Sequence, residues 1–189
     1  IDFKSDLLKL DRFKTDEIQY GILRIGYGLI KKLLFANSLS RLVDIQTQAF
    51  ETEVSMLSAW IIVFAFSFQI YCDFAGYSFM AIGLALVMGI ELMENFRRPY
   101  FSKNISEFWR RWHISLSSWF RDYFFTPFYI YLGSIKFLKR YSLKFRHTLT
   151  FMMALLITEY FLGLWHGAGW NYGFFGIYHA LMIGIYYFV

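Results

Sequence analysis

The chain has 189 residues, of which 57% are hydrophobic, 23% are aromatic and only 17% are charged. Its formal net charge of +5 at pH 7 is small and clustered, so the basic residues are expected to orient loops and not to bind nucleic acid. The single cysteine, Cys72, excludes an intrachain disulfide framework and a cysteine-rich metal site.

Long uncharged stretches predict an integral membrane protein with an all-α, polytopic fold. Residues 54–72 and 74–90 carry no charge, and residues 160–189 carry none apart from two histidines. Apolar runs of about 18 residues or more are long enough to cross a bilayer. The chain starts without Met and stops inside an apolar run, so we expect residues 1–189 to be one membrane-embedded segment of a longer protein.

The first third of the chain is the least regular part. Residues 1–17 alternate charged and apolar side chains, which predicts an amphipathic surface helix or a solvated loop. Residues 18–36 are apolar but contain three basic residues, so they form either a membrane helix with a basic end or a re-entrant or in-plane helix. Residues 37–53 are polar and are predicted to connect to the first membrane span, residues 54–72.

Asp73 separates two long apolar runs. Such a carboxylate either caps the following helix at an interface or lies buried with a partner, and we expect it to cap. The next helix, residues 79–93, contains Gly83 and Gly89, which allow another helix to approach closely. A polar loop, residues 94–99, ends this helix at a proline.

Residues 107–123, EFWRRWHISLSSWFRDY, concentrate the side chains that carry chemistry. Asn104 and Glu107 resemble a capping box, so a helix is expected to begin there. In a helix, an apolar set at i, i+3, i+4 and i+7 spacing shares one face: Trp109, Trp112, His113, Leu116, Trp119 and Phe120. The stretch is either an interfacial membrane helix with a spectator histidine or a functional face built around His113.

The last third begins with an aromatic segment, residues 124–132, which Pro127 is expected to kink. Residues 133–146 are basic without an acidic residue, which favours the cytoplasm. Residues 148–158 are predicted to re-enter the membrane, and Glu159 is expected to interrupt that helix.

The second notable stretch is residues 163–170, GLWHGAGW. Gly167 and Gly169 weaken the helix and let a ligand or another backbone approach His166. Ionisable groups in membrane segments are functional candidates, and histidine transfers protons near neutral pH; the alternative is a packing motif with a hydrogen-bonded imidazole. We expect His147 and His179 to be structural.

The sequence contains no nucleophile elbow, P-loop, dinucleotide fingerprint or zinc-type cluster. Two interpretations of the histidines therefore stay open. One histidine acts as a general base in a group transfer inside the membrane, or His113 and His166 are axial ligands of haem or ligands of a metal. The glycine-broken and arginine-flanked settings of these histidines fit the smooth apolar helices of haem bundles poorly.

Together the two stretches resemble the membrane-bound O-acyltransferase family, in particular the bacterial branch that acetylates alginate and related polysaccharides. QIYCDFAGYSFMAIGLALVMGI and ENFRRPYFSKNISEFW are similar to that branch as well, so the resemblance runs from about Gln69 to the end. Phe79 stands where an aspartate often follows the Tyr-Ser pair, and residues 126–132 lack the usual Gly-Gly. The sequence of Ala75–Phe79, AGYSF, is more similar to the sister branch that esterifies teichoic acids with D-alanine. The identity of the acceptor is therefore left undecided by the resemblance.

The resemblance implies a multi-pass enzyme of the bacterial inner membrane, with re-entrant or in-plane helices around a central cavity. An acyl thioester, such as acetyl-CoA or an acyl-carrier protein, arrives from the cytoplasm. The acceptor is an extracytoplasmic polysaccharide or a periplasmic acyltransferase partner. His166 corresponds to the catalytic histidine and His113 to the second functional histidine. No cofactor and no metal are implied.

Further residues are expected to contact the substrate or the donor: Arg110, Arg111, Arg121, Trp112, Trp165, Asp73 and Asn95. The three arginines suit anionic groups near the donor. Their positive charge is also expected to lower the pKa of His113 and keep its imidazole neutral.

Overall fold

The structure is a computed structural model that describes residues 14–53 and 55–188. Helices and the turns between them make up this described part, which contains no strand. The predicted all-α fold is therefore confirmed. The chain forms two compact units, Ile1–Glu94 and Asn95–Val189. Most of the predicted surface leader, residues 1–17, lies outside the described residues.

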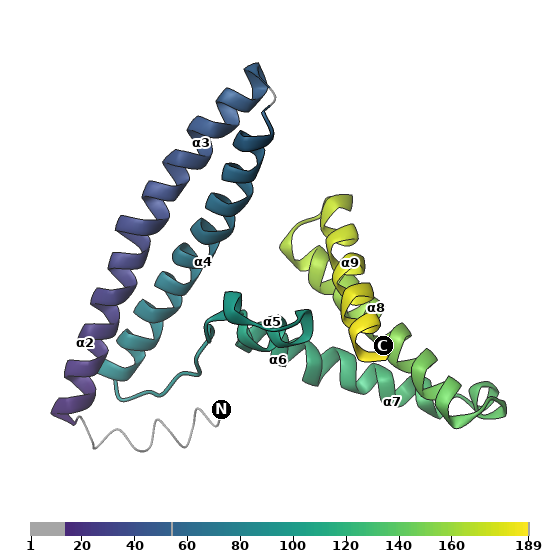
Figure 1. The fold of residues 1–189 in the computed structure, drawn as a ribbon. Coiled ribbons are helices and arrows are strands. Elements are labelled where there is room, and N and C mark those ends of the chain that lie inside the picture. The colour runs from purple at the N-terminus through teal and green to yellow at the C-terminus, as the bar shows by residue number, and fades with distance from the viewer. Residues whose placement is uncertain (1–13, 54, 189) are drawn as a thin grey trace. The chain divides into compact units, whose positions relative to one another are not determined.

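The first unit is a pair of long antiparallel rods (Figure 1). One rod runs without a break through α2 (Thr15–Ile30), the π-helical η1 (Lys31–Ala36) and α3 (Asn37–Thr52), and the other is α4 (Met56–Val87). The prediction that residues 37–53 are a polar connection was wrong. Their apolar side chains recur on one helical face that packs against α4, so the segment folds as a helix despite its polar composition.

Glycines bring α2 and α4 into backbone contact. A Cβ added at Gly21 would lie 2.7 Å from the carbonyl oxygen of Gly83, and one added at Gly28 would lie 2.6 Å from that of Gly76. Small residues at a helix crossing let two backbones approach this closely. The predicted close approach at Gly83 is thus confirmed, whereas Gly89 has a positive φ of 76° just beyond the end of α4.

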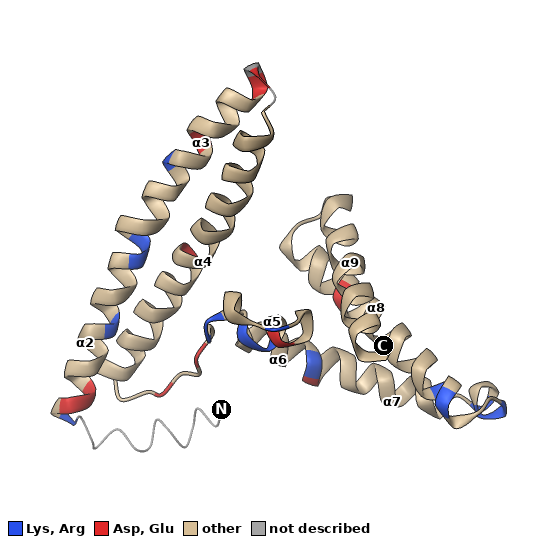
Figure 2. Ribbon diagram, in the orientation of Figure 1, with Lys and Arg blue, Asp and Glu red and all other residues tan. Residues whose placement is uncertain are grey.

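Ion pairs accompany this glycine contact. Asp73 lies in the middle of α4 and pairs with Lys32, so the prediction that it caps a helix was wrong. The side chain of Arg24, only 7% exposed, makes two hydrogen bonds of 2.5 and 2.9 Å to the carboxylate of Glu94. An ion in so apolar a helix pair (Figure 2) needs a counter-ion, because an unpaired charge there is costly.

The second unit is built from short helices followed by a helical hairpin. After the 3₁₀ turn η2 (Pro99–Phe101), the elements are α5 (Ile105–Arg111), α6 (Ile114–Phe120), the π-helical η3 (Arg121–Phe125), α7 (Thr126–Ser134), the 3₁₀ turn η4 (Lys136–Arg140), α8 (Leu143–His166) and α9 (Trp170–Phe188). Pro127 lies in the first turn of α7, where its missing N–H costs nothing.

Two predictions about this unit were wrong. Residues 107–123 do not form one helix, because the chain breaks between α5 and α6 at Trp112 and His113. Glu159 does not interrupt its helix, and α8 continues through it to His166. Glutamate is a good helix former, so a buried carboxylate does not by itself end a helix. Within the described part of the chain, α4 and α8 are the two helices long and apolar enough to cross a membrane.

The helices α8 and α9 form a hairpin (Figure 1), and glycines of both helices lie where the two backbones touch. A Cβ at Gly163 would overlap the carbonyl oxygen of Tyr172, and one at Gly176 would overlap that of Glu159. The two backbones therefore touch, and this contact sets the position of His166 at the end of α8 against the side chains of α9.

Candidate active site

The helix that leads to His113 begins as the sequence predicts. The side chain of Asn104 accepts a 2.8 Å hydrogen bond from the Glu107 N–H, and the Glu107 carboxylate accepts a 2.7 Å bond from the Lys103 N–H. This arrangement is close to a capping box. The helix ends after two turns, and His113 adopts a left-handed conformation with φ 42° and ψ 56°. Its imidazole therefore does not share a helical face with Trp109.

A segment preceding α5 crosses this break and bonds to both sides of it. The Arg97 N–H donates to the Arg111 carbonyl at 2.9 Å, and the Ile114 N–H donates to the Asn95 carbonyl at 3.0 Å. The side-chain oxygen of Asn95 accepts from the N–H and the hydroxyl of Ser115 at 3.0 and 2.7 Å. Asn95, predicted to contact substrate, thus uses its side chain to bond Ser115.

The structure brings the two predicted histidines together around Trp165. The ring centroids of His113 and Trp165 are 6.2 Å apart, and those of Trp165 and His166 are 5.1 Å apart with an edge-on orientation. His166 is the last residue of α8. A Cβ at the following residue, Gly167, would overlap the ring of Tyr172, so a glycine is needed there for this packing.

His113 is kept neutral by its surroundings. Burial, and after it the nearby His166, lower the pKa of the imidazole to about 4. The direction of the expected shift is therefore confirmed, but its cause differs from the prediction. Desolvation and a second imidazole replace the arginines as the reason, because burial disfavours the charged form of histidine.

The ring contacts continue beyond His166 to a third histidine. Phe175 lies 6.2 Å from His166 and 4.3 Å from His179, and Trp109 packs edge-on to His179 at 5.1 Å. The Nδ1–H of His179 donates to the carbonyl of Phe175 at 2.9 Å, which leaves Nε2 as the acceptor of the neutral ring. We call the six rings of His113, Trp165, His166, Phe175, His179 and Trp109 the aromatic row.

The sequence analysis missed the place of His179 beside the proposed site. Its position four residues after Phe175 on an otherwise ordinary apolar helix gives no such signal, because the contact depends on α5 packing against α9. His147, the other histidine expected to be structural, packs against Tyr129 and Phe151 with centroid distances of 5.9 and 6.4 Å.

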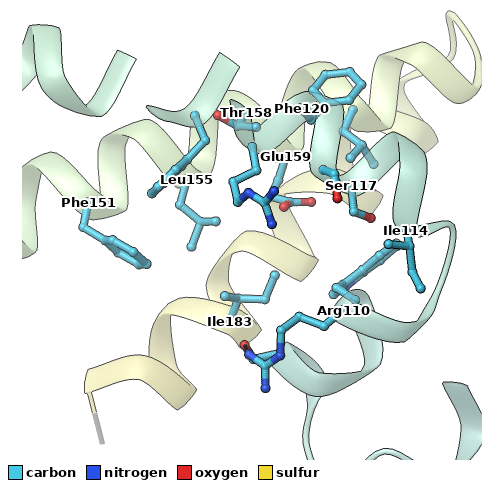
Figure 3. A pocket seen from close by; sticks show the side chains of 15 residues that line it. Arg110, Ile114, Ser117, Phe120, Phe151, Leu155, Thr158, Glu159 and Ile183 are labelled. Atoms are coloured by element: carbon cyan, nitrogen blue, oxygen red, sulfur yellow. Dashed lines mark hydrogen bonds between the residues drawn. The ribbon is translucent and has the colours of Figure 1, made fainter. Parts of the chain in front are cut away.

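Trp109 of the aromatic row lines a cavity of about 380 Å³, whose lining includes none of the histidines. Figure 3 shows side chains that line this cavity. Two of the predicted arginines, Arg110 and Arg121, line it. Its polar wall also includes Ser106, Ser117, Ser118, Thr158 and Glu159, and its apolar wall includes Phe151, Leu155 and Ile183. The Arg110 guanidinium donates to the Ser106 hydroxyl at 2.9 Å. The carboxylate of Glu159, a residue that the sequence analysis treated only as a helix interruption, makes no hydrogen bond or ion pair with another described residue.

The remaining predicted residues have intrachain roles in the structure. Arg111 pairs with Glu107 at 2.5 Å, an i, i+4 contact within α5. Trp112 stacks on Phe108 with a centroid distance of 5.7 Å. Asp73 belongs to the first unit, where it pairs with Lys32.

Comparison with known proteins identifies the family that the chain matches. The family described as membrane-bound O-acyltransferase matches residues 4–185. The chain is 42% identical over 170 residues to a probable alginate O-acetylase of Pseudomonas fluorescens. This alignment covers 90% of this chain and 31% of the relative. The chain is also 34% identical to a teichoic acid D-alanyltransferase of Bacillus subtilis. That alignment covers 91% of this chain and 42% of the relative.

A peptidoglycan O-acetyltransferase of Helicobacter pylori is also 34% identical, over 93% of this chain and 32% of that protein. The chain thus spans less than half the length of each of these three relatives. The family match, by contrast, takes in nearly the whole chain. This chain belongs to the membrane-bound O-acyltransferase family.

Proposed function

We propose that this chain forms the catalytic part of a bacterial inner-membrane enzyme that transfers an acyl group, in the simplest case acetyl, to hydroxyl groups outside the cytoplasm. The observation that carries the proposal is the meeting of His113 and His166 around Trp165 in a chain of this family. The acceptor is a polysaccharide or a periplasmic acyltransferase partner. The names of the alginate and peptidoglycan relatives favour acetyl transfer, and the teichoic acid relative makes D-alanyl transfer the alternative.

His166 acts as the general base in this proposal. Its imidazole removes the proton from the acceptor hydroxyl while the oxygen attacks the carbonyl carbon of the acyl thioester. The new carbon–oxygen bond replaces the carbon–sulfur bond, and the proton passes from the imidazole to the sulfur of the departing thiol. Gly167, which directly follows the end of α8, leaves room for the Tyr172 ring and not for a substrate, because an added Cβ would overlap that ring.

The donor, acyl-CoA or an acyl-carrier protein, enters from the cytoplasmic side, nearer to His113. Arg110 and Arg121 line the same cavity with three serines, which suits an anionic group of the donor because guanidinium forms charge-assisted hydrogen bonds to such groups. Arg110 is the strongest donor-binding candidate of the three arginines, since Glu107 already binds the guanidinium of Arg111 and Asp122 that of Arg121.

Replacing each histidine in the full-length protein tests the proposal. His166→Ala is expected to reduce polymer acylation in cells by about 10² to 10⁴, the usual contribution of a general base. His113→Ala is also expected to impair it, whereas His147→Ala, a histidine away from the aromatic row, is expected to acylate normally at matched protein level. Near-normal acylation by His166→Ala would show that the wrong histidine has been assigned.

The same proteins separate the transferase from the haem alternative. We expect the purified full-length protein to be colourless. A Soret band that disappears in His113→Ala or His166→Ala would instead support electron transfer.

A further inference from the structure

His113 occupies a backbone conformation that few residues other than glycine adopt. Its φ of 42° lies in the left-handed region, where side chains with a Cβ are uncommon because the Cβ crowds the following carbonyl oxygen. Such a conformation persists only where the surroundings hold it in place. The question is which residues hold it.

The hydrogen bonds at the start of α6 identify them. His113 is the residue before the first turn of α6, yet its imidazole does not cap that helix. The N–H groups of Ile114 and Ser115 are instead satisfied by the carbonyl and the side-chain oxygen of Asn95. A helix N-terminus needs such acceptors, and they usually come from the residue at its own cap position.

We propose that Asn95 is the positioning residue that fixes His113 beside Trp165 by capping α6 from another segment of the chain. The imidazole is thereby released from capping and packs 6.2 Å from the Trp165 ring. The Arg97 N–H, bonded to the Arg111 carbonyl at 2.9 Å, anchors the same segment on the other side of the break. Asn95 acts through His113 and does not touch substrate. This inference rests on the proposed role of His113 in acyl transfer.

The chain offers a matched control for this inference. Asn104 also caps a helix with its side-chain oxygen, but from the cap position of α5 itself, 2.8 Å from the Glu107 nitrogen, and α5 and α6 each have 7 residues. Asn104→Ala therefore removes an equivalent cap without touching the turn at His113. Asn95→Asp keeps the side-chain oxygen that accepts from Ser115, whereas Asn95→Ala removes it.

The experiment measures polymer acylation by full-length variants at matched protein level. Asn95→Ala is expected to lower acylation by roughly tenfold to 10²-fold, the scale of losses from a misplaced catalytic group. Asn95→Asp is expected to restore most of the activity, and Asn104→Ala to stay within about twofold of the parent protein, since that cap does not position the histidine. Equal losses in Asn95→Ala and Asn104→Ala would overturn the inference, because they would reflect general weakening of the short helices.

A double-mutant cycle with His113→Ala makes the test specific. If Asn95 acts through His113, the double variant is no less active than His113→Ala alone. Losses that multiply would show an independent role for Asn95 and overturn the inference. Full acylation by both His113→Ala and His166→Ala would instead refute the proposed function itself.

Ser115→Ala provides a second route if Asn95→Ala does not accumulate in the membrane. It removes one of the two hydrogen bonds that the side-chain oxygen of Asn95 accepts, the 2.7 Å bond from the Ser115 hydroxyl, and leaves the backbone bond in place. The inference is supported if Ser115→Ala alone lowers acylation partially but lowers it no further in a protein that already carries His113→Ala. A loss that adds to that of His113→Ala counts against it.

Discussion

At the scale of single residues, burial determines the charge state of His113. The imidazole lies in the turn between α5 and α6, and desolvation is the main cause of its lowered pKa, with His166 second. A neutral imidazole can accept a proton or a hydrogen bond at physiological pH, whereas a protonated one can only donate. The structure therefore supports a neutral His113 even though arginines flank it in sequence.

This shift predicts a dependence of stability on pH. The pKa of His113 is about 4 in the folded chain and about 6.5 in an unfolded chain. Between these values the unfolded chain binds more protons, so the free energy of unfolding falls as the pH drops from 6.5 toward 4. We expect the melting temperature of His113→Gln to fall less steeply on acidification than that of the parent protein.

Thermal unfolding of both full-length proteins in detergent, from about pH 7.5 down to about pH 4.5, covers most of the interval between the two pKa values and measures this difference. Parallel curves would show that His113 titrates as an exposed histidine does. His147→Gln serves as the control, because the ring of His147 packs against Tyr129 and Phe151, away from the aromatic row.

At the scale of elements, the α8–α9 hairpin places two of the three histidines of the aromatic row. His166 ends α8 and His179 lies in α9, with Phe175 in contact with both. Glycines at the helix crossing allow this, because any Cβ at Gly176 would overlap the carbonyl oxygen of Glu159 in α8. The hairpin is thus held at a separation that a larger residue cannot keep.

Gly176→Ala is expected to destabilise the protein for this reason. The added methyl forces α8 and α9 apart, and overpacking of this kind costs about 1–3 kcal/mol. Gly133→Ala is the matched control, because a Cβ there meets nothing within 4 Å and alanine is the better helix former. We expect a lower melting temperature and weaker acylation for Gly176→Ala, and an unchanged or higher melting temperature for Gly133→Ala. The reverse order would show that the hairpin is not closely packed at Gly176.

At the scale of the whole molecule, the basic segment of residues 133–146 is the basis for orientation. It runs from the last residues of α7 through the 3₁₀ turn η4 into the first turn of α8. It has no acidic residue and five basic ones, Lys136, Lys139, Arg140, Lys144 and Arg146. Short loops rich in Lys and Arg remain in the cytoplasm. We therefore expect the start of α8, one of the two candidate spans in the described part of the chain, to lie on the cytoplasmic side.

Cysteine labelling tests that orientation. Cys72 is first replaced, and a cysteine is then introduced at Ser134, which is exposed in the structure. A membrane-impermeant thiol reagent is expected to leave this cysteine unlabelled in intact cells and to label it after the cells are broken open. Labelling in intact cells would reverse the orientation and move the proposed donor side with it.

The sequence by itself determined the features that depend on composition and on neighbours within a few residues. Uncharged apolar runs predict membrane helices wherever they occur, and the helix start at Asn104 needs only the bonds among Lys103, Asn104 and Glu107. The two histidine stretches were recognisable for the same reason, since each motif is contained in fewer than twenty residues. Their identification with the family is confirmed by the match to residues 4–185.

The tertiary structure alone decided the features that depend on partners far apart in the chain. Asp73 became an ion pair and not a cap because Lys32 lies opposite it. The helix predicted over residues 107–123 broke at His113, where Asn95 supplies the acceptors for α6. His179 joined the aromatic row because α5 packs on α9. Helical periodicity records which side chains share a face, but it does not record which distant group will satisfy a backbone N–H or a charge.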